Sequence, residues 1–488
     1  MTTLWTSAEA EAATGGRATR AFDAAGVTID SRAVEPGDLF VALKDVRDGH
    51  DFVAAALEAG AAAALVSRIP EGLDERAPLL IVEDTLAGLE ALAAAARART
   101  KAKVVAVTGS VGKTSTKEML RAALAPQGAT HAAEKSYNNH WGVPLTLARM
   151  PKATKYAVIE IGMNHAGEIR PLTKLARPHV ALITTVAPVH MAHFRSEAEI
   201  AFAKAEILEG LEPGGVAILP RDNPHYDRLA RRAKRVGVKT ILRFGSSPRC
   251  TARMLKAAPG PGGTALTARI HGRNALVKIG APGSHFAMNA LAVLLAVEAV
   301  GADPARAALA LGAWHAPDGR GSRWRIALDA AGLDGAVHLV DESYNANPTS
   351  VGAALDVLAA SAPEDGFGRH IKGRKIAILG DMLELGPDEV ALHRGLAEHP
   401  AMAALDRVHT VGPLMKALHD ALPAERRGRH AADSEGMARE VRRLLDAGDV
   451  VMVKGSLGAR MARVVAAVKA LGRPAPETPE GDDEGQDA

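Results

Sequence analysis

Four short apolar runs recur in the middle of the chain, and each is followed by polar residues and a stretch of helix formers. The runs are rich in Val, Ile and Ala and occupy residues 104–108, 157–161, 180–186 and 216–219. Runs of this length with β-branched residues predict buried strands, and their alternation with helical stretches predicts a mostly parallel sheet. Ligands of such sheets gather at the carboxyl ends of the strands, so we expect the chemistry there.

The same alternation returns in the last third of the chain. Strands are predicted at residues 336–340, 375–379, 407–411 and 450–453, with helices between them, which indicates a second, Rossmann-like unit. Between residues 243 and 283 the pattern changes to short β runs broken by Pro and Gly, which predicts an antiparallel insertion.

The N-terminal part has shorter β runs, at residues 27–32 and 34–43, followed by a predicted helix at 51–64. We therefore predict an α/β protein of three domains: a small one at 1–84, a central one at 85–317 and a C-terminal one at 318–472. The length of 488 residues fits about three domains. Residues 473–488 are rich in Pro, Gly, Asp and Glu and predict a disordered acidic tail.

Composition narrows the class of protein. Hydrophobic residues make up 47% and charged residues 24%, as in ordinary soluble proteins. The net charge of +3, from 59 basic and 56 acidic residues, gives no indication of nucleic acid as the main partner. The single cysteine, Cys250, excludes an internal disulfide framework and a cysteine-rich metal site. No signal peptide or membrane-spanning run is evident, so we expect a cytoplasmic enzyme without membrane insertion.

The first candidate site is KVVAVTGSVGKTSTKEML at residues 103–120, which predicts a strand, a phosphate-binding loop and a helix. Gly109 and Gly112 allow backbone N–H groups to approach phosphate oxygens, Lys113 adds a positive charge, and the Thr114 hydroxyl can reach a Mg²⁺ ion. The loop is one residue shorter between its glycines than the usual GxxxxGK[ST]. An ordinary glycine-containing turn is the alternative for this motif taken alone.

Two further polar features follow predicted strands. Glu160 lies near the end of an apolar strand, where an ionised group is costly unless it is paired or bound to metal, and we predict a Mg²⁺ ligand there. The run DESYNANP at residues 341–348 is expected in a loop, because Pro348 suits the first turn of a helix. Taken alone, His190 carries no such signal, and Lys204 reads as a solvated helix residue.

Several motifs together resemble one family. TGSVGKTS at 108–115, NNHWGVPLTL at 138–147 and DESYNANP at 341–348 are similar, in this order, to motifs of the Mur ligase family, ATP-dependent amide-forming enzymes of cell-wall synthesis. The similarity runs from about residue 29 to 461 and is strongest to the MurF branch. It implies that ATP activates the carboxylate of UDP-N-acetylmuramoyl-tripeptide as an acyl phosphate, which the amine of D-alanyl-D-alanine then attacks. Either meso-diaminopimelate or lysine suits the third peptide position.

The resemblance also implies roles for individual residues. It assigns catalysis to Lys113, Glu160, His190, Lys204 and Arg320. It assigns ATP contacts to Thr108, Gly109, Ser110, Val111, Gly112, Lys113, Thr114, Ser115, Asn289, Arg320, Asp341, Tyr344 and Asn345. It assigns substrate contacts, the UDP part included, to Ser31, Arg32, Asp48, His50, Asn138, Asn139 and Lys454. It places two Mg²⁺ ions on Thr114, Glu160, His190 and a carbamylated Lys204.

Two departures and two alternatives accompany this interpretation. Ala192 stands where MurF relatives commonly have Glu, and Glu342 replaces the second aspartate of DDSYNANP. A sister ligase is the first alternative, either a MurE-type enzyme that adds a diamino acid or folylpolyglutamate synthase; DESYNANP in place of a DYAHNP run favours MurF. A nucleotide-dependent binding or regulatory subunit is the second, and it has no need of a full metal-ligand set. We expect a monomer.

Overall fold

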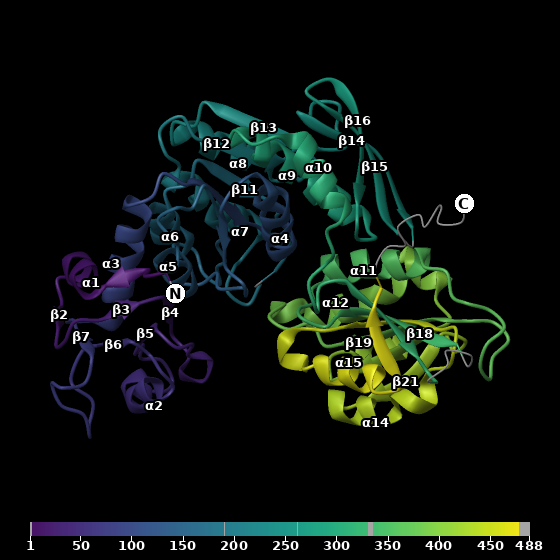
Figure 1. Cartoon of the computed structure of the whole chain (residues 1–488). Coiled ribbons are helices and arrows are strands. Elements are labelled where there is room, and N and C mark those ends of the chain that lie inside the picture. Colours follow the sequence, from purple (N-terminus) through teal and green to yellow (C-terminus); the bar gives the residue numbers. More distant parts are fainter. Residues whose placement is uncertain (1, 190, 261, 330–334, 478–488) are drawn as a thin grey trace, which may run out of the picture.

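Three large β-sheets, of five, nine and seven strands, organise the described part of the chain. The structure is a computed structural model that describes residues 2–189, 191–260, 262–329 and 335–477. Figure 1 shows an N-terminal part in purple, a central part in blue and teal, and a C-terminal part in green and yellow. The sheets lie within residues 17–81, 103–279 and 322–476. The α/β class is confirmed, whereas the boundaries at residues 84 and 317 stay predictions.

The N-terminal sheet has five strands in the order β2-β7-β6-β5-β4. They are β2 (Arg17–Ala18), β4 (Gly26–Thr28), β5 (Asp38–Val41), β6 (Ala63–Val66) and β7 (Leu79–Ile81). A two-stranded sheet of β1 (Trp5–Thr6) and β3 (Asp23–Ala24) and the helices α1 (Ser7–Thr14) and α2 (Val53–Glu58) complete this part. The predicted helix at 51–64 is wrong beyond Glu58, because the fully buried β6 runs between β5 and β7.

The central sheet has nine strands in the order β16-β15-β14-β13-β12-β11-β8-β10-β9. They are β8 (Lys103–Thr108), β9 (Thr130–Ala132), β10 (Tyr156–Glu160), β11 (Val180–Ile183), β12 (Val216–Pro220), β13 (Thr240–Gly245), β14 (Ala252–Gly260), β15 (Gly263–Ile270) and β16 (Arg273–Ile279). The strands from β9 to β14 pair in parallel, and β14, β15 and β16 form an antiparallel meander. Both the parallel sheet and the antiparallel insertion are therefore confirmed.

Helices cover both faces of the central sheet. On one face α4 (Lys113–Leu124), α9 (Ser284–Ala299) and α10 (Pro304–Gly312) pack into one apolar core. On the other face lie α5 (Gly142–Ala148), α6 (Ile169–Ala176), α7 (Glu197–Lys204) and α8 (Tyr226–Arg235). Helix α3 (Thr85–Ala98) joins α5 in the apolar core of the N-terminal part, so this core ties the first two parts together.

The C-terminal sheet has seven strands in the order β21-β20-β19-β22-β18-β17-β23. They are β17 (Ser322–Ala327), β18 (Ala336–Glu342), β19 (Lys375–Gly380), β20 (Arg407–Val411), β21 (Arg427–Ala431), β22 (Val450–Lys454) and β23 (Arg473–Pro476). One face packs on α11 (Pro348–Ala360), α12 (Glu389–Gly395) and α13 (Lys416–Ala421), and the other on α14 (Ser434–Leu444) and α15 (Ala462–Lys469).

The end of the chain differs from the prediction. Strand β23 pairs antiparallel with β17 at the sheet edge, so a disordered tail that begins at Arg473 is wrong. The backbone of Glu477 continues this pairing with a hydrogen bond from its N–H to the carbonyl of Arg323, at 3.0 Å. The remainder of the predicted tail, residues 478–488, lies outside the described residues.

Candidate active site

The phosphate loop joins β8 to α4, and its two glycines are required by geometry. A Cβ atom on Gly109 would lie 1.8 Å from Thr184 Oγ1, so no side chain fits there. Gly112 has φ of +84°, in the left-handed region that favours glycine. It caps α4 without a side-chain hydrogen bond, so the first N–H groups of the helix are open to an anion.

Lys113 lies at the start of α4 and folds back over this loop. Its Nζ donates a hydrogen bond to the carbonyl of Gly109 at 2.8 Å. Desolvation lowers the pKa of Lys113; the nearby Glu160 opposes the change and Arg320 adds to it. The ammonium is thus held at the phosphate loop beside a second cation, an arrangement that suits a ligand with several negative charges.

Glu160 ends β10 and has a carboxylate that is only half satisfied. Its Oε1 accepts hydrogen bonds from Thr114 Oγ1 at 3.1 Å and from Asn138 Nδ2 at 2.7 Å. Its Oε2 is buried and has no hydrogen-bond partner in the described part of the chain. A buried carboxylate oxygen without a partner is costly, and a hard cation such as Mg²⁺ prefers oxygen ligands of this kind. Thr114 and Glu160 therefore fit a Mg²⁺ ion.

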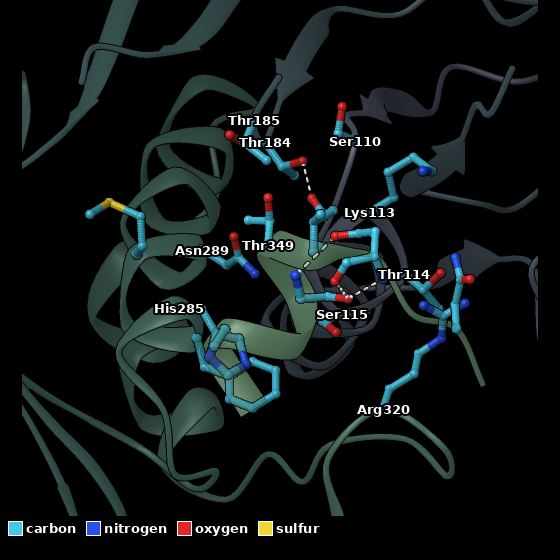
Figure 2. A pocket seen from close by; sticks show the side chains of 18 of the residues that line it. Ser110, Lys113, Thr114, Ser115, Thr184, Thr185, His285, Asn289, Arg320 and Thr349 are labelled. Carbon is cyan, nitrogen blue, oxygen red and sulfur yellow. Dashed lines mark hydrogen bonds between the residues drawn. The ribbon is translucent and has the colours of Figure 1, made fainter. Parts of the chain in front are cut away.

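A cavity of about 590 Å³ lies between the phosphate loop and the C-terminal part. Figure 2 shows side chains from α4, α9 and the C-terminal region around it. Many of the predicted site residues line it, namely Ser110, Val111, Gly112, Lys113, Thr114, Ser115, Asn138, Glu160, Asn289, Arg320, Tyr344, Asn345 and Lys454. The structure thus brings together residues that lie up to about 340 positions apart in the sequence.

Arg320 reaches into this cavity from the C-terminal side (Figure 2). Its Nη2 donates a hydrogen bond to Ser136 Oγ at 3.1 Å. The guanidinium carbon also lies 4.0 Å from the centre of the Tyr344 ring, as in a cation–π contact. Both contacts hold the Arg320 cation near Lys113, where the C-terminal part meets the phosphate loop.

The DESYNANP segment is arranged differently from the prediction of a loop. Asp341 and Glu342 are the last residues of β18, so the loop begins only at Ser343. Asp341 is buried, and its Oδ1 accepts hydrogen bonds from Ser343 N at 3.0 Å and Ser343 Oγ at 2.6 Å. It holds the turn and is not among the lining residues of the cavity. Glu342 instead lines the cavity beside Lys454, whose Nζ lies 3.1 Å from Glu342 Oε2.

Lys204 is the last residue of α7 and is 2% exposed, so the expectation of a solvated lysine from sequence alone is wrong. Desolvation, and then repulsion from Lys113, lower the pKa of Lys204 well below its ordinary value. Its side chain, Thr108 and Gly109 are not among the lining residues of the cavity. His190 lies outside the described residues.

The predicted UDP-binding residues Arg32, Asp48 and His50 lie in the N-terminal part, where their side chains form hydrogen bonds within the protein. Arg32 makes two hydrogen bonds to the Asp30 carboxylate, at 2.9 and 2.8 Å, and these lower the pKa of Asp30 to about 2. Asp48 accepts from His50 Nδ1 at 2.6 Å, while His50 Nε2 accepts from the backbone N–H of Ser67 at 2.9 Å. Both nitrogens of the buried His50 ring are therefore engaged within the protein.

Two more residues that were predicted to contact substrate, Ser31 and Asn139, lie in the caps and turns that begin short helices. Ser31 begins a short 3-10 helix that is capped by Asp30. Asn139 Oδ1 accepts from the backbone N–H of Gly142 at 2.9 Å, so it stabilises the start of α5 and does not line the cavity. These positions are structural supports here, and their predicted substrate contacts stay predictions.

The sequence analysis missed several lining residues. Ser136 lies two residues before the NNHWGVPLTL segment and was given no role, and Thr184 and Thr185 follow β11 directly at the edge where ligands are expected. The rule that ligands gather where parallel strands end would have found the two threonines. The same rule covers Asp222, just after β12, and Glu342, at the end of β18, whereas Phe286 on α9 carries no comparable signal.

Comparisons with known proteins cover most of the chain. The family description "Mur ligase family, catalytic domain" matches residues 23–122, "Mur ligase middle domain" matches 107–297, and "Mur ligase, glutamate ligase domain" matches 328–457. Within the described residues no helix is long and apolar enough to cross a membrane.

Relatives and solved structures agree with these matches. The UDP-N-acetylmuramoyl-tripeptide–D-alanyl-D-alanine ligase of Escherichia coli K12 is 38% identical over 91% of this chain and 94% of its own, and that of Bacillus subtilis is 34% identical over 90% and 92%. MurF from Acinetobacter baumannii superimposes with a TM-score of 0.80 at 28% identity, over 96% of this chain and 99% of its own. MurF ligase from Thermotoga maritima in complex with ADP has a TM-score of 0.72 at 26% identity, over 91% and 97%. The chain belongs to the Mur ligase family.

Proposed function

We propose that this protein is an ATP-dependent ligase that joins D-alanyl-D-alanine to UDP-N-acetylmuramoyl-tripeptide in the synthesis of peptidoglycan precursors. Relatives that carry this activity in their names match nine-tenths or more of the chain. The observation that carries the proposal is the cavity in which the phosphate loop of the central part faces Arg320 and Lys454 of the C-terminal part. That placement puts an ATP site next to a second surface from which an acceptor can approach.

Amide formation from a carboxylate needs an activated acyl group, because an oxide ion is a poor leaving group. The terminal carboxylate of the tripeptide attacks the γ-phosphorus of ATP, the bond from this phosphorus to the bridging oxygen breaks, and ADP leaves. The amine of the dipeptide then attacks the acyl carbon of the acyl phosphate, loses a proton, and expels inorganic phosphate. The products are the amide, ADP and phosphate, so atoms and charges balance.

In phosphoryl transfer the protein mainly has to align the reacting groups and to neutralise the negative charge of the phosphates. The open N–H groups at the start of α4 and the Lys113 ammonium supply donors on one side of the cavity. Arg320 supplies a planar guanidinium on the other side, and such a group binds phosphate oxygens with two parallel hydrogen bonds. The reacting phosphorus is thereby held between two cations that belong to different parts of the protein.

We propose that Thr114 and Glu160 hold a Mg²⁺ ion, with His190 and Lys204 at a second one. When bound, Mg²⁺ neutralises negative charge on the phosphate oxygens. The buried Oε2 of Glu160 supports the first assignment, because it has no hydrogen-bond partner among the described residues. The lowered pKa of Lys204 supports carbamylation, because only a neutral amine adds CO₂; the new N–C bond forms, one proton leaves, and a carbamate anion results.

The remaining parts have proposed roles of their own. The N-terminal domain binds the UDP portion through the segment around Ser31 and Arg32, where the Arg32 side chain is exposed. Asn289 on α9 lies next to Gly112 and contacts the nucleotide beside the phosphate loop (Figure 2). Domain boundaries near residues 84 and 317, a monomeric state and a cytoplasmic location complete the proposal.

A screen of amine acceptors distinguishes this function from that of a sister ligase. Phosphate release is followed with ATP, Mg²⁺ and UDP-N-acetylmuramoyl-tripeptide, and D-alanyl-D-alanine is compared with single amino acids, a diamino acid and glutamate. We expect phosphate release when D-alanyl-D-alanine is the amine and not when any of the other amines replaces it. Release only with a diamino acid or with glutamate, each with its matching acyl substrate, would move the protein to a MurE-type ligase or to folylpolyglutamate synthase.

A further inference from the structure

Ser136 connects two groups that the reaction needs. It follows β9 along the chain and lines the cavity at its edge. Its Oγ lies 3.2 Å from Thr114 Oγ1 at the start of α4, and it accepts a hydrogen bond from Arg320 Nη2 at 3.1 Å. One small hydroxyl therefore touches both the phosphate-loop helix and the arginine of the C-terminal part.

The direction of these hydrogen bonds follows from the number of protons available. The Thr114 hydroxyl has one proton, and it donates this proton to the Glu160 carboxylate at 3.1 Å. Ser136 must then donate its own proton to Thr114, which leaves its lone pairs to accept from Arg320. The result is an ordered chain of donors that begins at a guanidinium and ends at the proposed metal ligand.

The backbone next to Ser136 is held in place by a buried lysine of α4. Lys117 on α4 is fully buried, and its Nζ donates to the carbonyl of Ala133 at 2.5 Å and to that of Lys135 at 3.4 Å. These two carbonyls lie three residues and one residue before Ser136. The serine hydroxyl is therefore placed relative to α4 by a short, buried cross-link.

The contact with Arg320 is also the link between two large parts of the molecule. When both partners are described residues, no other hydrogen bond or ion pair joins the chain up to Trp314 with the chain from Gly319 onward. A long arginine side chain is mobile unless it is held, and a mobile side chain loses more freedom when a ligand binds it. Ser136 removes that freedom before the nucleotide arrives.

We propose that Ser136 is a positioning residue that holds the Arg320 guanidinium beside the phosphate loop and so prepares the cavity for ATP. This inference rests on the proposed function only in that Arg320 contacts the phosphates of ATP. The serine itself touches no reacting atom; it acts through Arg320.

A double-mutant cycle tests this role by nucleotide binding. The wild type, S136A, R320A and the double variant are each titrated with a non-hydrolysable ATP analogue and Mg²⁺ in a calorimeter. We expect Ser136→Ala to weaken binding about fivefold in the wild type, of the order that one ordinary hydrogen bond contributes, and to have a much smaller effect once Arg320 is Ala. Equal losses in both backgrounds, or no loss in the wild type, would overturn the proposal.

Two further variants guard against a mere loss of structure. S136T keeps the hydroxyl and is expected to bind the analogue within about twofold of the wild type. E134Q changes an exposed side chain of the same segment and should bind as the wild type does. If Ser136→Thr were as weak as Ser136→Ala, the hydroxyl would not be the operative group and the proposal would fail.

The readout separates this inference from the ligase activity. Coupling in the cycle together with no dipeptide-dependent product would remove the proposed function and leave the role of Ser136 standing. Additive losses in an enzyme that makes the expected product would remove the role of Ser136 alone.

Discussion

The proposed site depends on a few single side chains, and these differ in how well the sequence alone predicts their surroundings. Glu160 could be predicted, because a carboxylate within an apolar strand is costly without a partner, and the structure buries it to 2% exposure. Lys204 could not, because a lysine among alanines is compatible with either face of a helix, and only packing shows which face α7 buries. Ser136 could not be predicted either, because one of its two hydrogen-bond partners, Arg320, lies 184 residues away in the sequence.

At this scale we predict that Glu160→Gln lowers activity without lowering stability. ATP turnover should fall at least a hundredfold, because the variant loses the charge that a Mg²⁺ ion needs. The melting temperature without metal should not fall, because the charge that is removed has one oxygen without a partner. Calorimetric scans and an ATPase assay measure the two effects.

Glu206 provides the matched control for that variant. It is also buried, but its two oxygens accept from the backbone N–H groups of Gly167 at 2.8 Å and Arg170 at 3.1 Å. E206Q should therefore cost about 1–3 kcal/mol of stability. A fall in melting temperature for Glu160→Gln as large as that for Glu206→Gln would contradict the view that the Glu160 carboxylate destabilises the metal-free protein.

A second prediction at the residue scale concerns carbamylation of Lys204. Lys204→Arg cannot form the carbamate and places a permanent cation in this buried site beside Lys113, so we expect activity to fall at least a hundredfold and the melting temperature to fall as well. Wild-type protein that is equilibrated with isotopically labelled bicarbonate should show a carbamate signal by carbon NMR, and Lys204→Arg should lack it. The same signal in both proteins would disprove the assignment.

Helices and strands were predictable where the sequence of a run favours only one of the two, and less so at the ends of domains. The strands β8, β10, β19, β20 and β22 lie within a residue of their predicted bounds, because each is a run that is buried over all or all but its first residue. The helix predicted at 51–64 failed at its end, where the run AAAALV at residues 61–66 suits either state, and pairing with β5 decided for a strand. β23 was missed because its Pro-rich sequence predicts an edge strand at best.

The ionic contacts that anchor β23 give a pH-dependent prediction at the scale of elements. His338 on β18 contacts Glu477 Oε1 at 2.5 Å and Glu364 Oε1 at 3.0 Å. The hydrogen bond with Glu477 and the charges of both carboxylates raise the pKa of His338 above its ordinary 6.5, although burial opposes this. A raised folded-state pKa contributes stability that is fully present below pH 6.5 and is lost as the pH rises through the folded-state value.

Chemical denaturation across this pH range measures the effect. The free energy of unfolding of the wild type should fall relative to that of His338→Gln as the pH rises above 6.5, because only the wild type releases the proton from this site. Hydrogen exchange should locate the change at β17 and β23, which pair at the edge beside β18. Parallel stability profiles for the two proteins would rule out a contribution of this histidine.

At the scale of the whole molecule, function depends on how two parts face each other. The order of the three sheets along the chain followed from the alternation of strands and helices, but the cavity between the second and third did not, because no local pattern encodes the orientation of one sheet toward another. Figure 1 shows the C-terminal part beside the central one. A single hydrogen bond between their described residues, from Arg320 to Ser136, allows motion between them.

We therefore predict that the C-terminal part closes when ATP binds. Both sides of the cavity carry cations for the same phosphates, so bound nucleotide draws them together. Small-angle X-ray scattering should give a smaller radius of gyration with a saturating ATP analogue and Mg²⁺ than without it. Equal radii would count against closure.

The transfer of labelled oxygen tests the central claim most directly. UDP-N-acetylmuramoyl-tripeptide with heavy oxygen in its terminal carboxylate is incubated with ATP, Mg²⁺ and D-alanyl-D-alanine, and both products are weighed by mass spectrometry. An acyl phosphate requires that one heavy oxygen leaves with inorganic phosphate while the pentapeptide keeps the other. Unlabelled phosphate, or phosphate release without a pentapeptide product, would contradict the account of this protein as a dipeptide-adding ligase.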